Sequence, residues 1–290
     1  MNSENQKQYS PSLWNKRLPV DQVVTAHGEY LAKNSDQARH KLLSHTFRFS
    51  DLDPEQSIEI MYSDPKAFSA TENSNILNFN GGYWQWGSVS DSSFMSEHFC
   101  QKNVITVAVG YTIAPKACMS EIFCQVERAV AKILENSGKS EVFICGHSAG
   151  GHLASMLLFS DFKRIYHVDA FNLKGIISVS GIFDLRPLLE TDINDNLKMD
   201  LEESRRLSPM LRSDLRLHKD VKFLIVYAQN DSPAFHKQSE DFKMHLSKSL
   251  GYENVKSIEI KDFDHFNIIE NISRDDFILT KEIYKFMKVD

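Results

Sequence analysis

The sequence lacks the common patterns of cofactor and metal sites. It contains no G-x-G-x-x-G fingerprint and no P-loop, which are the glycine-rich patterns of nucleotide binding. Its 11 histidines include no H-E-x-x-H pair, and His147 and His152 are spaced so that they would not face one another on a helix. We therefore expect neither a cofactor nor a bound metal ion.

Cysteine is also scarce. The four cysteines, Cys100, Cys118, Cys124 and Cys145, form no C-x-x-C pair, and Cys145 lies in an apolar run. This usage predicts reduced, mostly buried thiols rather than a disulfide framework.

Long apolar runs and basic clusters are missing as well. No run approaches the length needed to span a bilayer, and the first residues are polar with no apolar segment behind them. The net charge is -6, and lysine and arginine are scattered, which argues against nucleic acid or an anionic membrane as the main partner. We expect a cytosolic protein whose partner is a small molecule.

Apolar runs alternate with helical patterns along most of the chain. A helical stripe covers residues 119–135, and a second helical stretch covers about 238–250. Strands are predicted at 57–62, 76–79, 104–109, 142–145, 175–180, 221–227 and 255–260. This alternation predicts the α/β class, with a mostly parallel central sheet flanked by helices.

The 290 residues are expected to form one domain, since no boundary is visible and 42% of the residues are hydrophobic. Residues 1–50 are interpreted as an N-terminal arm, with a helix from about 20 to 43. The irregular polar stretch of about 184–220 interrupts the regular pattern and is interpreted as a small cap-like insertion.

The segment Gly146-His147-Ser148-Ala149-Gly150 follows an apolar strand and leads into a helical pattern. A strand that ends in G-x-S-x-G and turns directly into a helix is typical of a nucleophile elbow, in which a strained turn exposes a serine hydroxyl. The glycines leave room for close contact between strand and helix. Ser148 is the predicted nucleophile.

A serine nucleophile needs a histidine base and a carboxylate that orients it. In α/β-hydrolase sheets the chain order is serine, acid, histidine, with the last two on loops after late strands. Asp231 follows the predicted strand at 221–227, and His265 follows the strand at 255–260. These two residues are therefore the predicted acid and base.

Other candidates fit less well. His236 and His245 fall in or beside the helix after Asp231, which favours an ordinary polar role. Asp264 adjoins His265, and neighbouring side chains on an extended loop tend to diverge. Asp184 follows the strand at 175–180, the less common place for the acid.

Acyl transfer also requires hydrogen-bond donors for the developing oxyanion. The backbone N–H of Ala149, directly after the nucleophile, is one expected donor. Gly81 and Gly82 follow the predicted strand at 76–79 and precede a Tyr-Trp pair, so we expect their loop to complete the oxyanion hole.

Taken together, six segments resemble the kynurenine formamidase (arylformamidase) family of α/β-hydrolases, and the likeness spans nearly the whole chain. The segments are Tyr9-Ser10-Pro11-Ser12-x-Trp14, Asn80-Gly81-Gly82-Tyr83-Trp84-Gln85, Tyr111-Thr112-Ile113-Ala114-Pro115-Lys116, Cys145-Gly146-His147-Ser148-Ala149-Gly150, Asp231-Ser232-Pro233-Ala234-Phe235-His236 and Asp264-His265-Phe266. The resemblance implies hydrolysis of N-formyl-L-kynurenine to kynurenine and formate in tryptophan catabolism, by a cytosolic homodimer. It places the triad roles on Ser148, Asp231 and His265.

The chain departs from this family at one position, because the family loop begins with histidine where this sequence has Asn80. Asn80 can both donate and accept hydrogen bonds, so we expect it to brace the same loop beside the substrate. A flat aryl formamide calls for an aromatic wall, and the candidates are Tyr83, Trp84, Phe235 and Phe266. The alternatives are a broader small-acyl carboxylesterase and a non-catalytic binding protein on the same fold.

Overall fold

The computed structural model describes residues 3–66, 74–79, 81–217 and 219–289. Within these ranges eight strands form one sheet in the order β1-β2-β4-β3-β5-β6-β7-β8. β2 runs antiparallel to β1 and β4, and the other neighbouring pairs are parallel. The strands are β1 (Leu43–Arg48), β2 (Ser57–Tyr62), β3 (Ser74–Phe79), β4 (Val104–Val109), β5 (Glu141–His147), β6 (Leu173–Val179), β7 (Lys222–Ala228) and β8 (Val255–Ile260).

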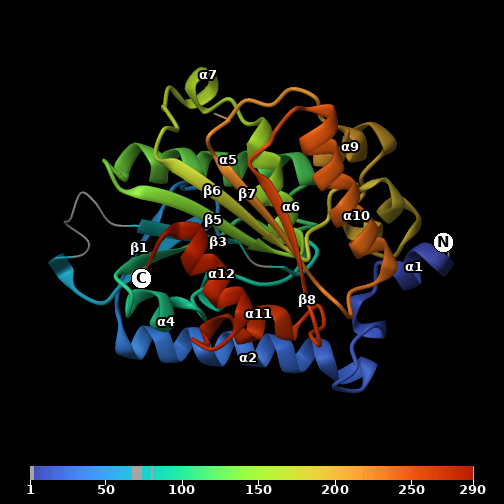
Figure 1. Cartoon of the computed structure of the whole chain (residues 1–290), viewed down its shortest axis with the longest axis horizontal. Coiled ribbons are helices and arrows are strands. Elements are labelled where there is room, and N and C mark those ends of the chain that lie inside the picture. Colours follow the sequence, from blue (N-terminus) through green and yellow to red (C-terminus); the bar gives the residue numbers. More distant parts are fainter. Residues whose placement is uncertain (1–2, 67–73, 80, 218, 290) are drawn as a thin grey trace.

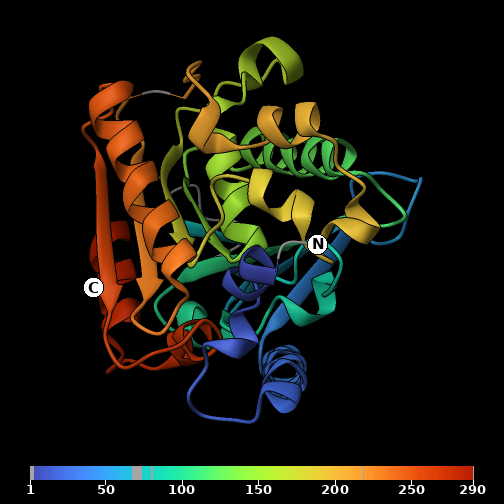
Figure 2. The same ribbon diagram turned by 90° about the vertical axis from the view of Figure 1, so that its right-hand side faces the viewer.

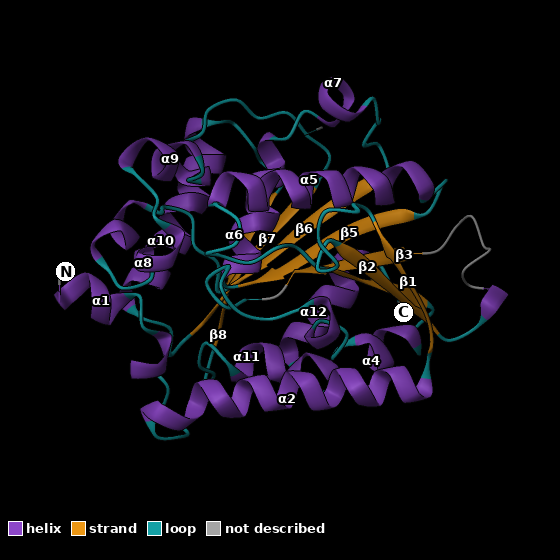
Figure 3. Ribbon diagram, turned by 180° about the vertical axis from the view of Figure 1, so that it is seen from behind, coloured by secondary structure: helices purple, strands orange, loops and turns teal. Residues whose placement is uncertain are grey.

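Helices cover both faces of this sheet (Figures 1 and 3). α5 and α6 lie on one face, whereas α2, α4, α11 and α12 lie on the other. The α-helices are α1 (Ser3–Gln8), α2 (Val20–Lys41), α4 (Ser96–Cys100), α5 (Met119–Asn136), α6 (Ala149–Met156), α7 (Phe162–Tyr166), α8 (Asn194–Leu197), α9 (Leu201–Arg206), α10 (Pro233–Met244), α11 (Asn267–Glu270) and α12 (Ile278–Met287).

The apolar run of β5 is explained by burial on both sides. Val142 and Ile144 pack into the core beneath α5 and α6, while Phe143 and Cys145 pack into the core beneath α4, α11 and α12. Successive side chains of a strand point to opposite faces, so a strand covered on both faces must be apolar throughout. Each of the seven predicted strands is present, and its ends lie within two residues of the predicted ones.

The first strand was not expected. β1 pairs with β2 at the edge of the sheet, and five of its six residues are exposed. An exposed edge strand has no apolar alternation, so its sequence carries no strand pattern. The predicted helix before it is confirmed and ends at Lys41.

The expectation of mostly buried thiols is wrong for two of the four cysteines. Cys100 and Cys145 are buried, but Cys118 and Cys124 are exposed. Cys118 caps the N-terminus of α5, and Cys124 lies on the solvent side of that amphipathic helix.

In the described part of the chain, no helix is both long and apolar enough to cross a membrane.

The segment from 184 to 220 lies between β6 and β7 and contains short helices, including α8 and α9. It is tied to α6 by a hydrogen bond of 2.6 Å between His152 Nε2 and the Leu207 carbonyl. It is tied to the loop after β3 by Gln85, whose side-chain amide donates to the Ile193 carbonyl at 2.9 Å. The segment therefore rests against both the elbow helix and the glycine loop.

The first part of the N-terminal arm, including α1, lies at the end of the sheet where its parallel strands finish (Figure 2). The Tyr9 carbonyl accepts a hydrogen bond of 2.6 Å from the Tyr83 hydroxyl, and the Tyr9 hydroxyl accepts one of 2.6 Å from the Gln238 amide. Burial holds the pKa of Tyr83 well above its ordinary value, so this phenol stays protonated and donates. The arm is thereby joined to the loop after β3 and to α10.

Candidate active site

The turn between β5 and α6 has the strained geometry of a nucleophile elbow. Ser148 adopts φ 54° and ψ −117°, a conformation that non-glycine residues rarely adopt. Its backbone N–H donates to the Val179 carbonyl at 2.8 Å, which anchors the turn to β6. A Cβ on Gly146 would lie 2.1 Å from the carbonyl oxygen of Gly150, so only glycine lets the helix approach the strand this closely.

His265 lies between Ser148 and Asp231. Its Nε2 is 3.0 Å from Ser148 Oγ, and its Nδ1 is 2.7 Å from Oδ1 of Asp231. All three residues are buried, with exposed fractions of 3% for Ser148, 5% for Asp231 and 3% for His265. They follow β5, β7 and β8 respectively, so the parallel strands bring them to one edge of the sheet.

The carboxylate of Asp231 is held on both oxygens. Oδ2 accepts hydrogen bonds from Ser180 Oγ at 2.6 Å and from the Ala228 N–H at 2.9 Å, while Oδ1 faces His265. Because a carboxylate only accepts, the neutral His265 ring carries its proton on Nδ1, and Nε2 remains free to accept the proton of Ser148. This arrangement can activate a serine hydroxyl.

The rival residues are engaged elsewhere. The carboxylate of Asp264 binds Arg17 Nε at 2.7 Å, and that of Asp184 binds Arg186 Nη2 at 2.7 Å. The rings of His236 and His245 are within hydrogen-bonding distance of backbone carbonyls, those of Ala228 at 2.9 Å and Arg212 at 2.7 Å.

The loop after β3 lies directly on the elbow. A Cβ on Gly81 would be 3.0 Å from His147 Nδ1 and 3.1 Å from Ser148 Cβ, so a side chain there would press against the elbow. Gly82 has φ 103°, and a Cβ on it would meet Trp86 Cβ at 2.8 Å. Within the described ranges, no protein acceptor lies within hydrogen-bonding distance of the backbone N–H groups of Gly81, Gly82 or Ala149. These groups can therefore receive an oxyanion.

Asn80, which begins this loop, lies outside the described residues. Its predicted bracing role and its predicted contact with the substrate stay predictions.

The four predicted wall residues occupy two different places. The rings of Phe235 and Phe266 flank His265, with centroids 4.9 Å and 5.5 Å from its imidazole. Trp84 is fully buried and packs edge-on against His152, whereas Tyr83 is half-buried and bonds to the arm. Substrate contact by any of them stays a prediction.

His147 was not singled out from the sequence as part of the site. Its Nε2 lies 2.7 Å from the backbone carbonyl of His265. Burial, with the neighbouring His265 and His27 rings, holds the pKa of His147 well below its ordinary value, so the ring is neutral and its N–H donates. His147 thus supports the backbone of His265, and its place at the variable position of G-x-S-x-G gives no sign of this.

The buried ring of His152, one turn after Ser148 in α6, is expected to make the stability of the protein depend on pH. Burial lowers its pKa from 6.5 to about 4. Below about pH 6.5 this histidine binds a proton in the unfolded chain but stays unprotonated in the native protein. The free energy of unfolding therefore falls as pH drops from about 6.5 towards 4. Between pH 7.5 and 5.0 this residue alone should remove about 2 kcal/mol from the free energy of unfolding.

The comparison is urea unfolding of the native chain and of His152→Gln at pH 7.5 and 5.0. The glutamine amide can still donate to the Leu207 carbonyl but does not titrate, so the variant should lose less stability on acidification. Equal losses in both proteins would show that His152 is not a source of the acid sensitivity.

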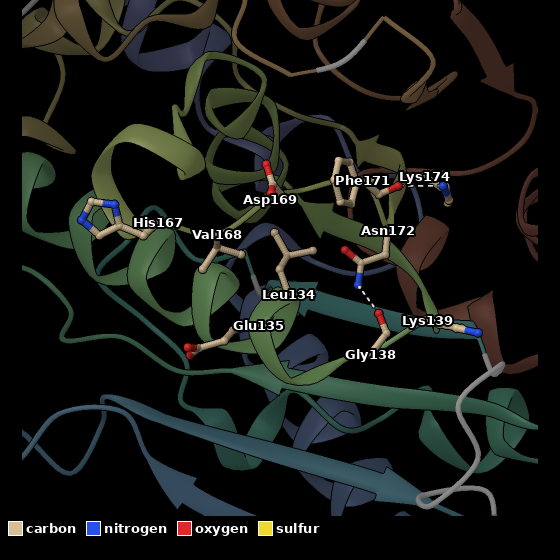
Figure 4. Close-up of a pocket in the computed structure, with 10 residues that line it drawn as sticks. All are labelled: Leu134, Glu135, Gly138, Lys139, His167, Val168, Asp169, Phe171, Asn172 and Lys174. Atoms are coloured by element: carbon tan, nitrogen blue, oxygen red, sulfur yellow. Dashed lines mark hydrogen bonds between the residues drawn. The ribbon is translucent and has the colours of Figure 1, made fainter.

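A surface pocket lies far from this constellation. It is lined by Leu134, Glu135, Gly138, Lys139, His167, Val168, Asp169, Phe171, Asn172 and Lys174 (Figure 4). These residues precede β5 and β6 or flank their first residues, whereas the triad follows the last residues of the strands. The charged side chains of this pocket are exposed or half-exposed, and no triad residue lines it.

Comparison with known proteins gives a consistent result. Residues 62–246 match the BD-FAE family model. The chain is 37% identical to the kynurenine formamidase of Danio rerio over 98% of its own length and 96% of that protein. Among solved structures, a protein from Silicibacter sp. superposes with a TM-score of 0.79 at 20% identity, covering 96% of this chain and 98% of that one. Esterase B of Lactobacillus rhamnosis superposes with a TM-score of 0.68 at 15% identity, covering 99% and 95%.

The structural neighbours confirm the predicted α/β-hydrolase fold. The identity and coverage shared with the fish enzyme confirm the resemblance that the six segments suggested. This chain belongs to the kynurenine formamidase family of α/β-hydrolases.

Proposed function

We propose that this protein hydrolyses the formamide of N-formyl-L-kynurenine to L-kynurenine and formate. The observation that carries the proposal is the hydrogen-bonded chain Ser148–His265–Asp231 in a protein that is 37% identical to a kynurenine formamidase over 98% of its length. Ser148 is the proposed nucleophile, His265 the general base and Asp231 the residue that orients His265.

In the first half-reaction, Ser148 Oγ attacks the formyl carbon while His265 Nε2 takes the hydroxyl proton. The starting distance of 3.0 Å between these atoms is within reach for such a transfer. The negative charge moves to the formyl oxygen, where the N–H groups of Gly81, Gly82 and Ala149 are the proposed donors. His265 then returns the proton to the departing aryl amine, and a formyl-serine remains.

In the second half-reaction, water attacks the formyl-serine while His265 takes a proton from it. The bond between Ser148 Oγ and the formyl carbon then breaks, His265 returns the proton to Ser148, and formate leaves. The carboxylate of Asp231 stabilises the imidazolium that forms in both steps. Its buried hydrogen bonds to Ser180 and Ala228 hold it in place. Neither half-reaction calls for a metal ion or a cofactor.

The 184–220 segment and the aromatic residues are the proposed source of selectivity. The proposed role of the segment is to cover a substrate at Ser148 as a cap, and its contacts with the glycine loop and α6 support this proposal. Tyr83, Trp84, Phe235 and Phe266 are the proposed wall for the aryl group, and Asn80 is the proposed brace of the loop.

On the family resemblance we also propose that the protein is a cytosolic homodimer. Light scattering coupled to gel filtration tests the dimer, and a mass of 33.3 kDa would correspond to a monomer.

The deciding assay offers the purified protein N-formyl-L-kynurenine and p-nitrophenyl acetate side by side. We expect the higher kcat/KM with the formamide. A clear preference for the ester would favour the small-acyl carboxylesterase. Failure on both substrates, together with no labelling of Ser148 by a fluorophosphonate probe, would favour the non-catalytic binding protein.

A further inference from the structure

The loop that carries His265 is joined to the N-terminal arm by an ion pair between Asp264 and Arg17. The buried carboxylate of Asp264, the residue before His265, accepts from Arg17 Nε at 2.7 Å and from Arg17 Nη2 at 3.3 Å. The same carboxylate accepts from the backbone N–H groups of Phe266 at 3.0 Å and Asn267 at 2.9 Å. Asp264 thereby joins the arm to the backbone on the far side of the proposed base.

The contacts of the arm extend to Glu270, the last residue of α11. Arg17 Nη1 also lies 3.3 Å from a carboxylate oxygen of Glu270, and His27 Nδ1 lies 2.9 Å from the other oxygen. The His27 ring packs edge-on against Phe266, with centroids 5.3 Å apart. Two residues of the arm therefore hold both ends of the segment 264–270.

Arg17 neutralises two acids that are largely shielded from water. The side chain of Asp264 is 2% exposed and that of Glu270 is 11% exposed. Burial raises the pKa of Asp264, but Arg17 and the N–H groups of Asn267 and Phe266 outweigh this, so its pKa lies below the ordinary value. Without Arg17 the carboxylate of Asp264 would be a buried charge with no cation beside it. The free-energy cost of such a charge falls when its segment moves towards water.

Any such movement would displace the proposed base. His265 is covalently next to Asp264, and its Nε2 is 3.0 Å from Ser148 Oγ, close to the outer limit of a productive hydrogen bond. A misplacement of about 1 Å in a catalytic group can cost about 100-fold in rate. Arg17, the positively charged partner of Asp264, is thus linked to the geometry of proton transfer.

We propose that Arg17 is a positioning residue, which holds His265 within hydrogen-bonding distance of Ser148 through its ion pairs with Asp264 and Glu270. It acts on proton transfer and not on substrate binding. The inference rests on the proposed hydrolytic function.

The test compares Arg17→Ala and Arg17→Lys with the native chain, using N-formyl-L-kynurenine and p-nitrophenyl acetate. We expect kcat of Arg17→Ala to fall about 10- to 100-fold on both substrates, with KM within about twofold. Lysine can pair with Asp264 but cannot form the fork of two hydrogen bonds, so Arg17→Lys should lie between the two.

Arg274→Ala is the matched control. Arg274 forms a comparable forked pair with Asp276, at 2.9 and 3.1 Å, but this pair is exposed and lies outside the 264–270 segment. Its kcat should stay within about twofold of the native value. Added methylguanidine should restore part of the kcat of Arg17→Ala, because the arginine site is 35% exposed, and it should leave Arg274→Ala unchanged.

Three outcomes would overturn the proposal. An Arg17→Ala protein that melts earlier but keeps its kcat would make Arg17 only structural. A rise in KM confined to N-formyl-L-kynurenine would make it a ligand for the substrate carboxylate. If Arg17→Ala does not fold, an unchanged kcat in Arg17→Lys overturns it. Inactivity of the native chain towards the formamide would refute the proposed substrate alone, since the ester still reports on His265.

Discussion

Replacing Ser148 with alanine is expected to lower kcat by ~10⁴ to 10⁶, equivalent to about 5–8 kcal/mol in the activation barrier. The hydroxyl of Ser148 is the group that His265 Nε2 faces, and alanine leaves nothing there to form a covalent intermediate. The fold should persist, because the strained backbone of the turn is held by the Val179 carbonyl and by the glycine contacts, not by the hydroxyl. The measurement is steady-state turnover of N-formyl-L-kynurenine with the melting temperature in parallel.

Ser155→Ala provides the matched control for this change. Ser155 is also a fully buried serine of the elbow region, but its hydroxyl donates to the Gly151 carbonyl within α6. Its loss should cost about 1 kcal/mol in stability and leave kcat within about threefold. Residual activity above a few per cent in Ser148→Ala, with contamination excluded, would remove Ser148 from the mechanism.

The second large effect is expected at Asp231. Asp231→Asn should lower kcat by ~10³ to 10⁴. The amide has only one accepting oxygen, so it cannot accept hydrogen bonds from Ser180 and Ala228 on one side and from His265 on the other. The amide then favours the wrong tautomer of the histidine, in which Nε2 carries the proton and cannot act as a base. Turnover of the variant, measured with its melting temperature, gives the size of the effect.

Asp184→Asn is the comparison for Asp231→Asn, since Asp184 is the alternative acid after β6. Asp184 forms a pair with Arg186, which is 42% exposed, so its loss should change kcat by less than about threefold. A larger loss of turnover at Asp184 than at Asp231 would transfer the orienting role to Asp184.

The three candidate triad residues could be named from the sequence because parallel strands all end at one edge of the sheet. Each of Ser148, Asp231 and His265 follows a strand that is recognisable from its residues alone, and the structure places the three within hydrogen-bonding distance. The glycines at 81 and 82 were informative for a different reason, since a Cβ at 81 would press against the elbow and a Cβ at 82 would meet Trp86.

Contacts across long stretches of chain could not be predicted in this way. Arg17 meets Asp264 although 247 positions separate them, and neither residue belongs to a periodic pattern. His147 supports His265 through a backbone carbonyl, which every residue possesses, so its partner cannot be read from side-chain types. The exposed edge strand β1 was missed because pairing, and not burial of its own side chains, defines it.

The joining of the N-terminal arm to the loop of His265 has a consequence for protein synthesis. The ribosome adds about 5–20 residues per second, so roughly 12–50 s pass between Arg17 and Asp264. In the later part of this interval, after Met156 has been added, the growing chain contains all of β5 and α6, with Ser148 between them, but lacks His265, the proposed base. We therefore expect a translation product that stops before β8 to be catalytically inert, however well its elbow has folded.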